Sequence, residues 1–318
     1  MSKKKKSSTR SRSRNQSRGK MKLRSHRKIK NAGPNLETTA AMLPQEMKNR
    51  IYGLVLGGNL LHIKRDLIKF KRDVVHSTKG DIKERRFTHQ ICCSQTSEED
   101  AQHRFDAEDG SSLYVKGIEL RHSGCGPSKR KGSAYTPLRM DVNLLHACRQ
   151  IYNEARFMPY STNTFSFHTP RNLRTFIHLL VQCGVNVNTA FRSLHVDIAH
   201  INHDLHGWGQ AFNAVTQHMT LLEKVYINVD QRPNWSICAD AEQKEAAMRP
   251  VLDCLAILGK TPAKSTMIVV SDRHLSRMSD ANLAGASTAW ISCRWTVEEK
   301  KMWVEEVKLA IQDTQFFG

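Results

Sequence analysis

Hydrophobic and polar positions follow two different periods along the second half of the chain. Apolar residues spaced by two predict strands at 165–168, 193–199, 223–229 and 265–270. Spacings of three and four predict helices at 172–182, 208–220, 240–258 and 296–312. Strands and helices therefore alternate, with a spacing of about 30 residues, and this pattern favours right-handed crossovers and a parallel sheet.

The predicted strands are short and the predicted helices are amphipathic, which distinguishes between two α/β architectures. We expect an α/β fold in which one layer of helices lies on one face of a parallel, leucine-rich-repeat-like sheet, in preference to a doubly wound sheet. The repeats lack a strict leucine consensus, so the pattern does not predict a true leucine-rich repeat. Pro250 should interrupt or kink the helix at 240–258.

Two further amphipathic helices are predicted before this repeat. One covers 142–158 and ends at Pro159 and the turn Ser161-Thr162-Asn163. The other covers 43–56, ends at Gly57-Gly58, and is followed by a possible strand at 59–63. Its predicted apolar stripe consists of Leu43, Met47, Ile51, Leu54 and Val55. Neither helix is long enough to be stable alone, so each must pack on the other or on the sheet.

The segment between these helices shows little periodicity. Residues 64–137 are charged and rich in Ser and Gly, with one possible strand at 111–122. We interpret them as a variable, partly disordered insert. The predicted organisation is a disordered basic tail at 1–38, a helix and strand at 39–63, the insert at 64–137, and the repeat body with its preceding helix at 138–318.

The charge of the chain is concentrated at its start. Residues 1–30 hold 14 Lys or Arg and no Asp or Glu, so they supply +14 of the formal net charge of +19. This tail is too polar to fold, and its basic runs at 3–6 and 20–30 are typical of nuclear-import signals. We therefore expect a nuclear location, with the cytoplasm as the alternative. Nonspecific nucleic-acid binding through residues 1–30 is a second functional hypothesis.

Other composition signals exclude several classes of protein. No stretch approaches the ~20 apolar residues of a membrane span, so we expect no membrane contact. The eight cysteines, without a secretion signal, are expected to be reduced. Cys148, Cys183 and Cys254 are predicted to be small core residues.

Candidate chemistry is limited to clusters that resemble metal ligands. His200, His203, Asp204 and His206 follow a predicted strand and could ligate zinc. A second possible zinc knuckle combines His89, Cys92 and Cys93 with His122 and Cys125, although this spacing matches no standard signature. Phosphate-binding loops, dinucleotide fingerprints and nucleophile elbows are absent from the sequence. We expect neither a catalytic site nor a cofactor, and we expect no bound metal.

Two stretches carry a family resemblance. LPQEMKNRIYGLVLGG at 43–58, with LLHACRQIYNEARFMPYSTNTFSF at 144–167, resembles fungal F-box-like proteins, also described as two-ExR-domain or domain-of-unknown-function proteins. The first stretch supplies the motif residues Leu43, Pro44, Glu46, Arg50, Ile51 and Tyr52. The second supplies Cys148, Arg149, Gln150, Ile151, Tyr152, Glu154, Arg156, Tyr160, Asn163 and Phe165.

The resemblance implies a function in protein binding. F-boxes are short helical modules that dock on the adaptor of a cullin-type ubiquitin ligase, while a repeat region selects the substrate. Leu43, Pro44, Glu46, Ile51 and Tyr52 would then bind the partner, and the second stretch would be structural. This chain departs from the pattern because about 90 residues separate the two halves, and because Lys48 replaces the Arg of the first Glu-x-Arg. We expect a non-enzymatic interaction module.

Overall fold

The computed structural model describes the greater part of the chain. These residues are 43–70, 82–118, 120–122, 125, 138–198, 204–230, 241–273, 275 and 294–316. The chain divides into two units, residues 1–43 and 44–318, and only Leu43 of the first unit is described. The predicted tail at 1–38 and the predicted ligands His200 and His203 lie outside the described residues.

A six-stranded sheet forms the centre of the described part of the chain. Its strands are β1 (Leu60–Phe70), β2 (Ile82–Ile91), β3 (Thr164–Phe167), β4 (Ser193–Ile198), β5 (Lys224–Asp230) and β6 (Ser265–Ser271). Their order is β2-β1-β3-β4-β5-β6. Only β2 is antiparallel to its neighbour, and the remaining pairs are parallel. The predicted α/β fold with a mostly parallel sheet is confirmed.

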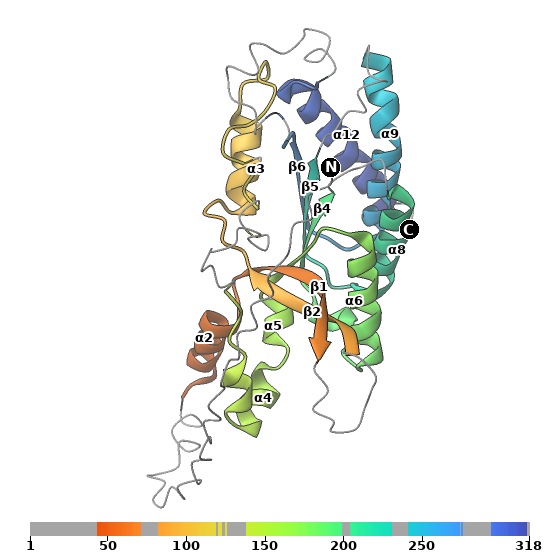
Figure 1. Cartoon of the computed structure of the whole chain (residues 1–318). Coiled ribbons are helices and arrows are strands. Elements are labelled where there is room, and N and C mark those ends of the chain that lie inside the picture. Colours follow the sequence, from red (N-terminus) through yellow and green to blue (C-terminus); the bar gives the residue numbers. More distant parts are fainter. Residues whose placement is uncertain are drawn as a thin grey trace, which may run out of the picture. The chain divides into compact units, whose positions relative to one another are not determined.

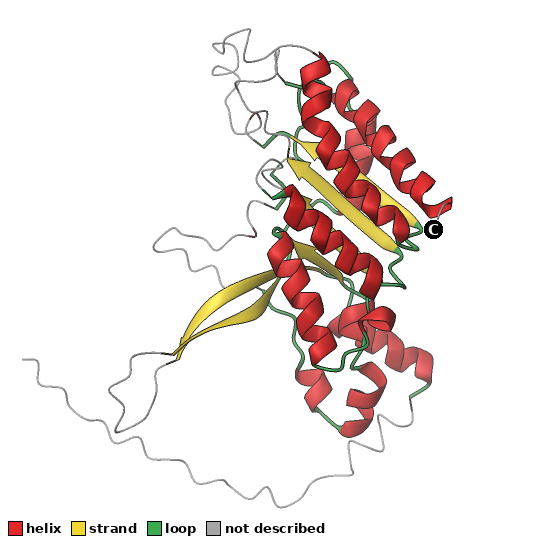
Figure 2. Cartoon of the chain, turned by 90° about the vertical axis from the view of Figure 1, so that its right-hand side faces the viewer, coloured by secondary structure: helices red, strands yellow, loops and turns green. Residues whose placement is uncertain are grey.

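One face of the sheet is apolar and covered by a layer of helices. The layer contains α6 (Pro170–Gln182), α8 (Leu205–His218), α9 (Ala241–Ala256) and α12 (Val297–Phe316), each in contact with the next (Figure 2). The short α7 (Val187–Ala190) and the 3-10 turn η4 (Ile257–Lys260) connect helix to strand. Alternate strand residues fill the core against these helices: Phe165, Phe167, Leu194, Val196, Ile198, Val225, Ile227, Val229, Ile268 and Val270. Thr296 and Glu299 form a capping box at the start of α12, in which each side chain accepts a hydrogen bond from the backbone N of the other residue.

The opposite face of the sheet is polar, and among the described residues the helix that lies on it is α3 (Glu98–Ala107). Figure 1 shows α3 on the other side of the strands from α8, α9 and α12. The strand residues between the apolar ones point to this face, and His62, Ser166, His195, Asp197 and Asn228 are buried there. Buried polar groups must find hydrogen-bond partners inside the protein, so a sheet face with this many of them is unusual.

The segment at 64–137 is more regular than the sequence suggested. β1 continues to Phe70, β2 pairs with it along its whole length, and α3 follows. The strand predicted at 111–122 is wrong, because its described residues form turns in which Val115 and Ile118 are buried separately. A positive φ of 89° at Gly117 allows this tight path.

The predicted helix at 142–158 is broken into three short pieces. These are η2 (Asn143–His146), α4 (Arg149–Ala155) and α5 (Met158–Ser161). Cys148 is the N-cap of α4, where its Sγ accepts a hydrogen bond from Ile151 N, so it is not the core residue that we predicted. α5 packs against α2 (Gln45–Leu56). Together α2, η2, α4 and α5 form what we call the α2–α5 lobe.

Among the described residues, no helix is long and apolar enough to cross a membrane. The described cysteines are all free thiols, as predicted. Cys254 is buried as expected, whereas Cys183 is exposed at the end of α6, contrary to the prediction.

Candidate functional site

An ion pair and a hydrogen bond join the two halves of the split motif. Glu154 of α4 accepts a hydrogen bond from Tyr52 Oη at 2.9 Å and lies 3.5 Å from Lys48 Nζ, while Gln150 Nε2 donates to it at 2.8 Å. Burial and the bond to Glu154 raise the pKa of Tyr52 to about 12. The bonds from Gln150 and Tyr52 lower the pKa of Glu154. Lys48, which replaces the motif's Arg, therefore still pairs with the Glu of the second Glu-x-Arg.

Asn163 fixes the junction between the lobe and the sheet. Its Nδ2 donates to Leu56 O at 2.5 Å and to Pro159 O at 2.8 Å, and its Oδ1 accepts from Asn59 N at 2.8 Å. The side chain is almost fully buried. Two residues later, Phe165 belongs to the main core, and its ring stacks on that of Tyr160. These motif residues have structural roles.

The remaining motif residues are spread around the lobe. Pro44 is the N-cap of α2, Glu46 is exposed in its first turn, and Leu43 is half-buried. Ile151 packs against the small cluster of Tyr52, Leu56 and Ala155, which is the core of the lobe. Arg149 is exposed, and Arg156 lies over the Phe157 ring, 4.7 Å from its centroid, and also faces Tyr152.

The apolar stripe of α2 faces solvent, which corrects the sequence interpretation. Met47 is 52% exposed, Ile51 40%, Leu54 80% and Val55 40%. The buried residues of α2 are instead Lys48, Tyr52 and Leu56. The periodicity correctly placed these four residues on one face, but the helix turns its other face to α4 because Tyr52 and Lys48 bind Glu154. Of the predicted partner-binding residues, Ile51 is exposed and Tyr52 is buried.

Polar side chains form continuous hydrogen-bonded rows across the second face of the sheet. Ser166 Oγ lies 3.1 Å from His62 Nδ1 and 2.8 Å from His195 Nδ1, so it links β1, β3 and β4. Further along the strands, His168 and Arg273 both bond to Asp197. Burial lowers the pKa of His195 to about 3, so this ring is neutral.

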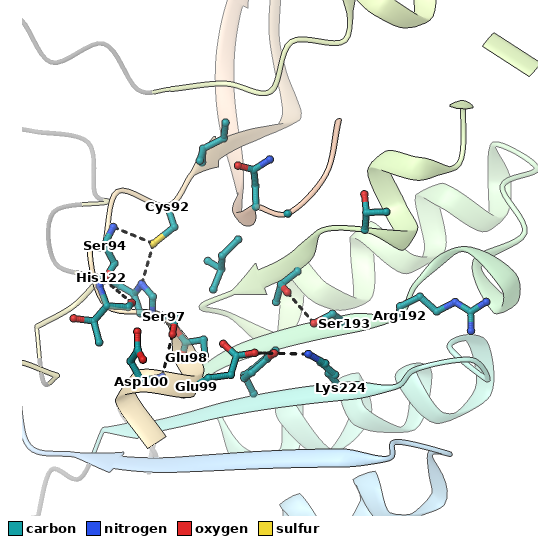
Figure 3. A pocket seen from close by; sticks show the side chains of 18 of the residues that line it. Cys92, Ser94, Ser97, Glu98, Glu99, Asp100, His122, Arg192, Ser193 and Lys224 are labelled. Atoms are coloured by element: carbon teal, nitrogen blue, oxygen red, sulfur yellow. Dashed lines mark hydrogen bonds and ion pairs between the residues drawn. The ribbon is translucent and has the colours of Figure 1, made fainter. Parts of the chain in front are cut away.

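A cleft of about 580 Å³ opens beside this face, at the amino ends of the parallel strands. Figure 3 shows Glu98 and Glu99 of α3 on one side of it and Ser193 and Lys224 of the sheet on the other. Lys224 Nζ lies 3.7 Å from Glu99 Oε1, and Tyr226 Oη donates to the same carboxylate at 2.5 Å. These contacts join α3 to the strands. The charges of Glu99 and Lys224 are therefore paired with each other instead of being free to bind a ligand.

Two cysteines and two histidines meet at the end of this cleft. They are His62 of β1, Cys92 just after β2, and His122 and Cys125 of the turn segment that follows α3. One donor atom from each lies within 4.8 Å of the other three. Cys92 Sγ is 3.6 Å from Cys125 Sγ and 3.4 Å from His122 Nδ1. This group could hold a metal ion, and we call it the His/Cys cluster.

Charged residues of α3 and the turn segment support the His/Cys cluster. His122 Nε2 lies 2.8 Å from Glu98 Oε1, and Arg121 holds both oxygens of Glu98, at 3.3 and 2.8 Å. Burial alone would raise the pKa of Glu98, but the bonds from His122 and Arg121 hold it well below its usual range. The hydrogen bond with Cys125 lowers the pKa of Cys92.

Only part of this cluster is predictable from the sequence. Cys92, His122 and Cys125 belong to the predicted knuckle, but His89 does not, because its Nε2 accepts a hydrogen bond from Met140 N at 3.1 Å. His62 takes its place. This residue was missed because it lies in a strand about 30 residues away, and only the pairing of β1 with β2 brings it to Cys92. Of the other predicted cluster, Asp204 and His206 are described: Asp204 is the N-cap of α8, and His206 bonds to Gln210.

A family model covers the greater part of the chain, residues 38–255, and its description is "Domain of unknown function (DUF7730)". The chain belongs to the DUF7730 family. Comparisons with curated proteins and with solved structures found no match. The matched segment contains the whole α2–α5 lobe and all four residues of the His/Cys cluster, whereas β6 and α12 follow it.

Proposed function

We propose that this DUF7730 protein is a non-enzymatic protein-interaction module that binds an adaptor of a cullin-type ubiquitin ligase through α2. The observation that carries the proposal is the exposed apolar stripe of Met47, Ile51, Leu54 and Val55. The resemblance of 43–58 to F-boxes supplies the partner class. Such a stripe at helical spacing suits a helix-in-groove interface.

The lobe supports the proposal because it presents α2 in a fixed orientation. Lys48 and Tyr52 hold α2 to α4 on the side away from the stripe, and Asn163 bonds its last carbonyl group to the sheet. A preformed helix loses little entropy on binding, so its apolar side chains contribute more of their burial energy to affinity. Tyr152 and Phe157, exposed on and just after α4, add apolar surface to the lobe.

The stripe can be tested with two matched double substitutions. Met47→Asp with Leu54→Asp places two charges seven residues apart on α2, and Met302→Asp with Leu309→Asp does the same on α12, where the side chains are 60% and 59% exposed. We expect the α2 variant to bind purified adaptor roughly tenfold more weakly or worse, because interface anchors dominate affinity. The α12 variant should bind like the wild type. Titration calorimetry measures both, with melting curves to verify folding.

Two results would count against this function. Wild-type protein that does not bind the adaptor would refute the ubiquitin-ligase proposal. Equal loss of binding in the α2 and α12 variants would show that the stripe is not the docking surface.

A second proposal concerns the basic residues 1–30, which lie outside the described part of the chain. Their 14 positive charges, with no acidic residue, favour nonspecific nucleic-acid association in the nucleus. Deletion of residues 1–30 should abolish binding to a random-sequence DNA duplex, and raising salt should weaken wild-type binding steeply, because counterions are released. Fluorescence anisotropy measures both effects. Undiminished binding by the truncated chain would contradict this proposal.

A further inference from the structure

We propose that His62, Cys92, His122 and Cys125 bind one structural Zn²⁺ ion. The donor set is the first argument. Two thiols and two imidazoles are the ligands of many structural zinc sites, and thiolates favour zinc over magnesium or calcium. The inference is independent of the proposed adaptor binding, because none of the four residues lies in the α2–α5 lobe.

The two distances from Cys92 Sγ to other donor atoms fit a tetrahedral ion, and all four donors lie within 4.8 Å of one another. With Zn–S of about 2.3 Å and Zn–N of about 2.0–2.1 Å, a tetrahedron places two sulfur ligands ~3.8 Å apart and sulfur and nitrogen ~3.5 Å apart. The structure has 3.6 Å from Cys92 Sγ to Cys125 Sγ and 3.4 Å from Cys92 Sγ to His122 Nδ1. The sulfur–sulfur distance is also far longer than the ~2.05 Å of a disulfide.

Each histidine is oriented as a metal ligand. His122 turns Nδ1 to Cys92 Sγ, and its Nε2 is 2.8 Å from the Glu98 carboxylate, which is the carboxylate–histidine–metal arrangement of zinc proteins. The ring of His62 is bonded at Nδ1 by Ser166, whereas its Nε2 is buried and has no hydrogen-bond partner among the described residues. A buried ring nitrogen without a partner is costly, and metal coordination removes that cost.

Hydrogen bonds also place the two cysteines as metal ligands. Ser94 N donates a hydrogen bond to Cys92 Sγ at 3.4 Å, as backbone amides do to thiolates. Lys64 Nζ donates to Cys125 O at 2.6 Å and so fixes the turn that carries this ligand. Cys93 Sγ lies 3.5 Å from Cys125 Sγ, but the Cys93 side chain is exposed, whereas His62 is fully buried. We therefore assign His62 as the fourth ligand and leave Cys93 outside.

Glu98, His122 and His195 form an overlapping group, but it fits a metal less well. Both oxygens of Glu98 already accept hydrogen bonds from Arg121, and one also bonds to His122. A carboxylate that is neutralised in this way supports a ligand more readily than it binds an ion itself. The four donors of the His/Cys cluster leave no position for water, so the site is structural.

The zinc ion would join three segments that are far apart in sequence. The ligands come from β1, from the end of β2 and from the turn segment after α3, and all except His62 lie in the segment at 64–137 that sequence periodicity did not resolve. Metal ligation can contribute folding energy to such segments. The expected phenotype of metal loss is therefore local unfolding of this region.

Elemental analysis of the full-length protein, purified without chelator, tests the proposal. We expect one zinc per chain, and X-ray absorption at the zinc edge should give two sulfur and two nitrogen neighbours. This measurement needs no variant, so it remains decisive if substitutions impair folding. Substoichiometric zinc after incubation with Zn²⁺, or a Cys93–Cys125 disulfide in peptide maps of the native protein, would overturn the proposal.

Variants then test the individual ligands. Cys92→Ser, Cys125→Ser and His62→Asn should each lower zinc content at least tenfold and abolish the thiolate charge-transfer band of the Co²⁺-substituted protein. Cys93→Ser and Cys254→Ser are the matched controls, one adjacent to the cluster and one in the core, and both should retain the metal. Zinc retained by Cys92→Ser but lost by Cys93→Ser would overturn the ligand assignment.

Discussion

Asp197 is an acidic residue of the polar sheet face whose carboxylate has three side-chain partners. It is fully buried, and it bonds to His168 Nδ1 at 2.8 Å, to Asn228 Nδ2 at 3.1 Å and to Arg273 at 2.5 Å. Burial would raise its pKa, but the bonds from His168 and Arg273 hold the pKa far below its ordinary value of 3.8. A carboxylate in this position must stay ionised for its partners to remain satisfied.

This pKa predicts an acid dependence of stability. Because the folded-state pKa lies below the unfolded-state value, Asp197 stabilises the fold fully above pH 3.8, and its contribution decreases as the pH falls further. The stability difference between wild type and Asp197→Asn should therefore be constant near neutrality and shrink below about pH 4. Denaturant unfolding at a series of pH values measures it.

The matched control for Asp197 is an exposed carboxylate on α9. The side chain of Asp253 is 64% exposed, and it pairs only with its helical neighbour Arg249. Asp253→Asn should change stability by less than about 0.5 kcal/mol at any pH. A wild-type advantage over Asp197→Asn that does not change with pH would show that His168 and Arg273 do not hold the pKa of this carboxylate below its unfolded-state value.

At the scale of elements, local sequence patterns predicted the repeat body well. β4, β5, β6, α6 and α8 have strong periods of two or 3.6, and each was placed within a few residues of its observed bounds. The failures have a common physical cause. α3 buries few apolar residues and contacts its neighbours through Glu98 and Glu99. Its sequence therefore lacks the apolar period that would have predicted a helix. Only the cap at Ser97, with three acidic residues after it, could have indicated it.

Helix faces illustrate a second limit of sequence patterns. The stripe on α2 identifies residues that share a face, but the period does not state whether that face packs inside the chain or is available to another molecule. Tyr52 and Glu154, 102 residues apart, decide the matter by attaching the opposite face to α4. The fourth residue of the His/Cys cluster, His62, was likewise not predictable, because only the pairing of β1 with β2 brings it to Cys92.

At the scale of the whole molecule, the fold extends beyond the segment that the family model matches. β6 pairs with β5 along its whole length, and α12 packs on α9 and η4. Trp303, Val304, Val307 and Ile311 of α12 are all buried in the main core. The core is therefore incomplete at residue 255.

A truncation tests this dependence on the C-terminal elements. A chain that ends at residue 255 would expose the edge of β5 and the buried face of α9, so we expect it to aggregate or to lose cooperative unfolding. A chain that lacks only residues 1–37 is the control and should melt like the full protein. Circular dichroism melting distinguishes the two outcomes, and a cooperative transition in the 1–255 chain would contradict the prediction.

The bonds between α12 and the turns after α3 have a consequence for synthesis on the ribosome. Lys300 Nζ donates to Leu113 O at 2.5 Å, Val297 N donates to Ser112 O at 2.6 Å, and Glu298 N donates to Gly110 O at 3.0 Å. The parallel strands β3, β4, β5 and β6 follow one another closely in sequence and can pair as they emerge, whereas these contacts span nearly 190 residues. The turns at 110–113 should thus remain open to solvent during translation and become fixed only when the last helix leaves the exit tunnel.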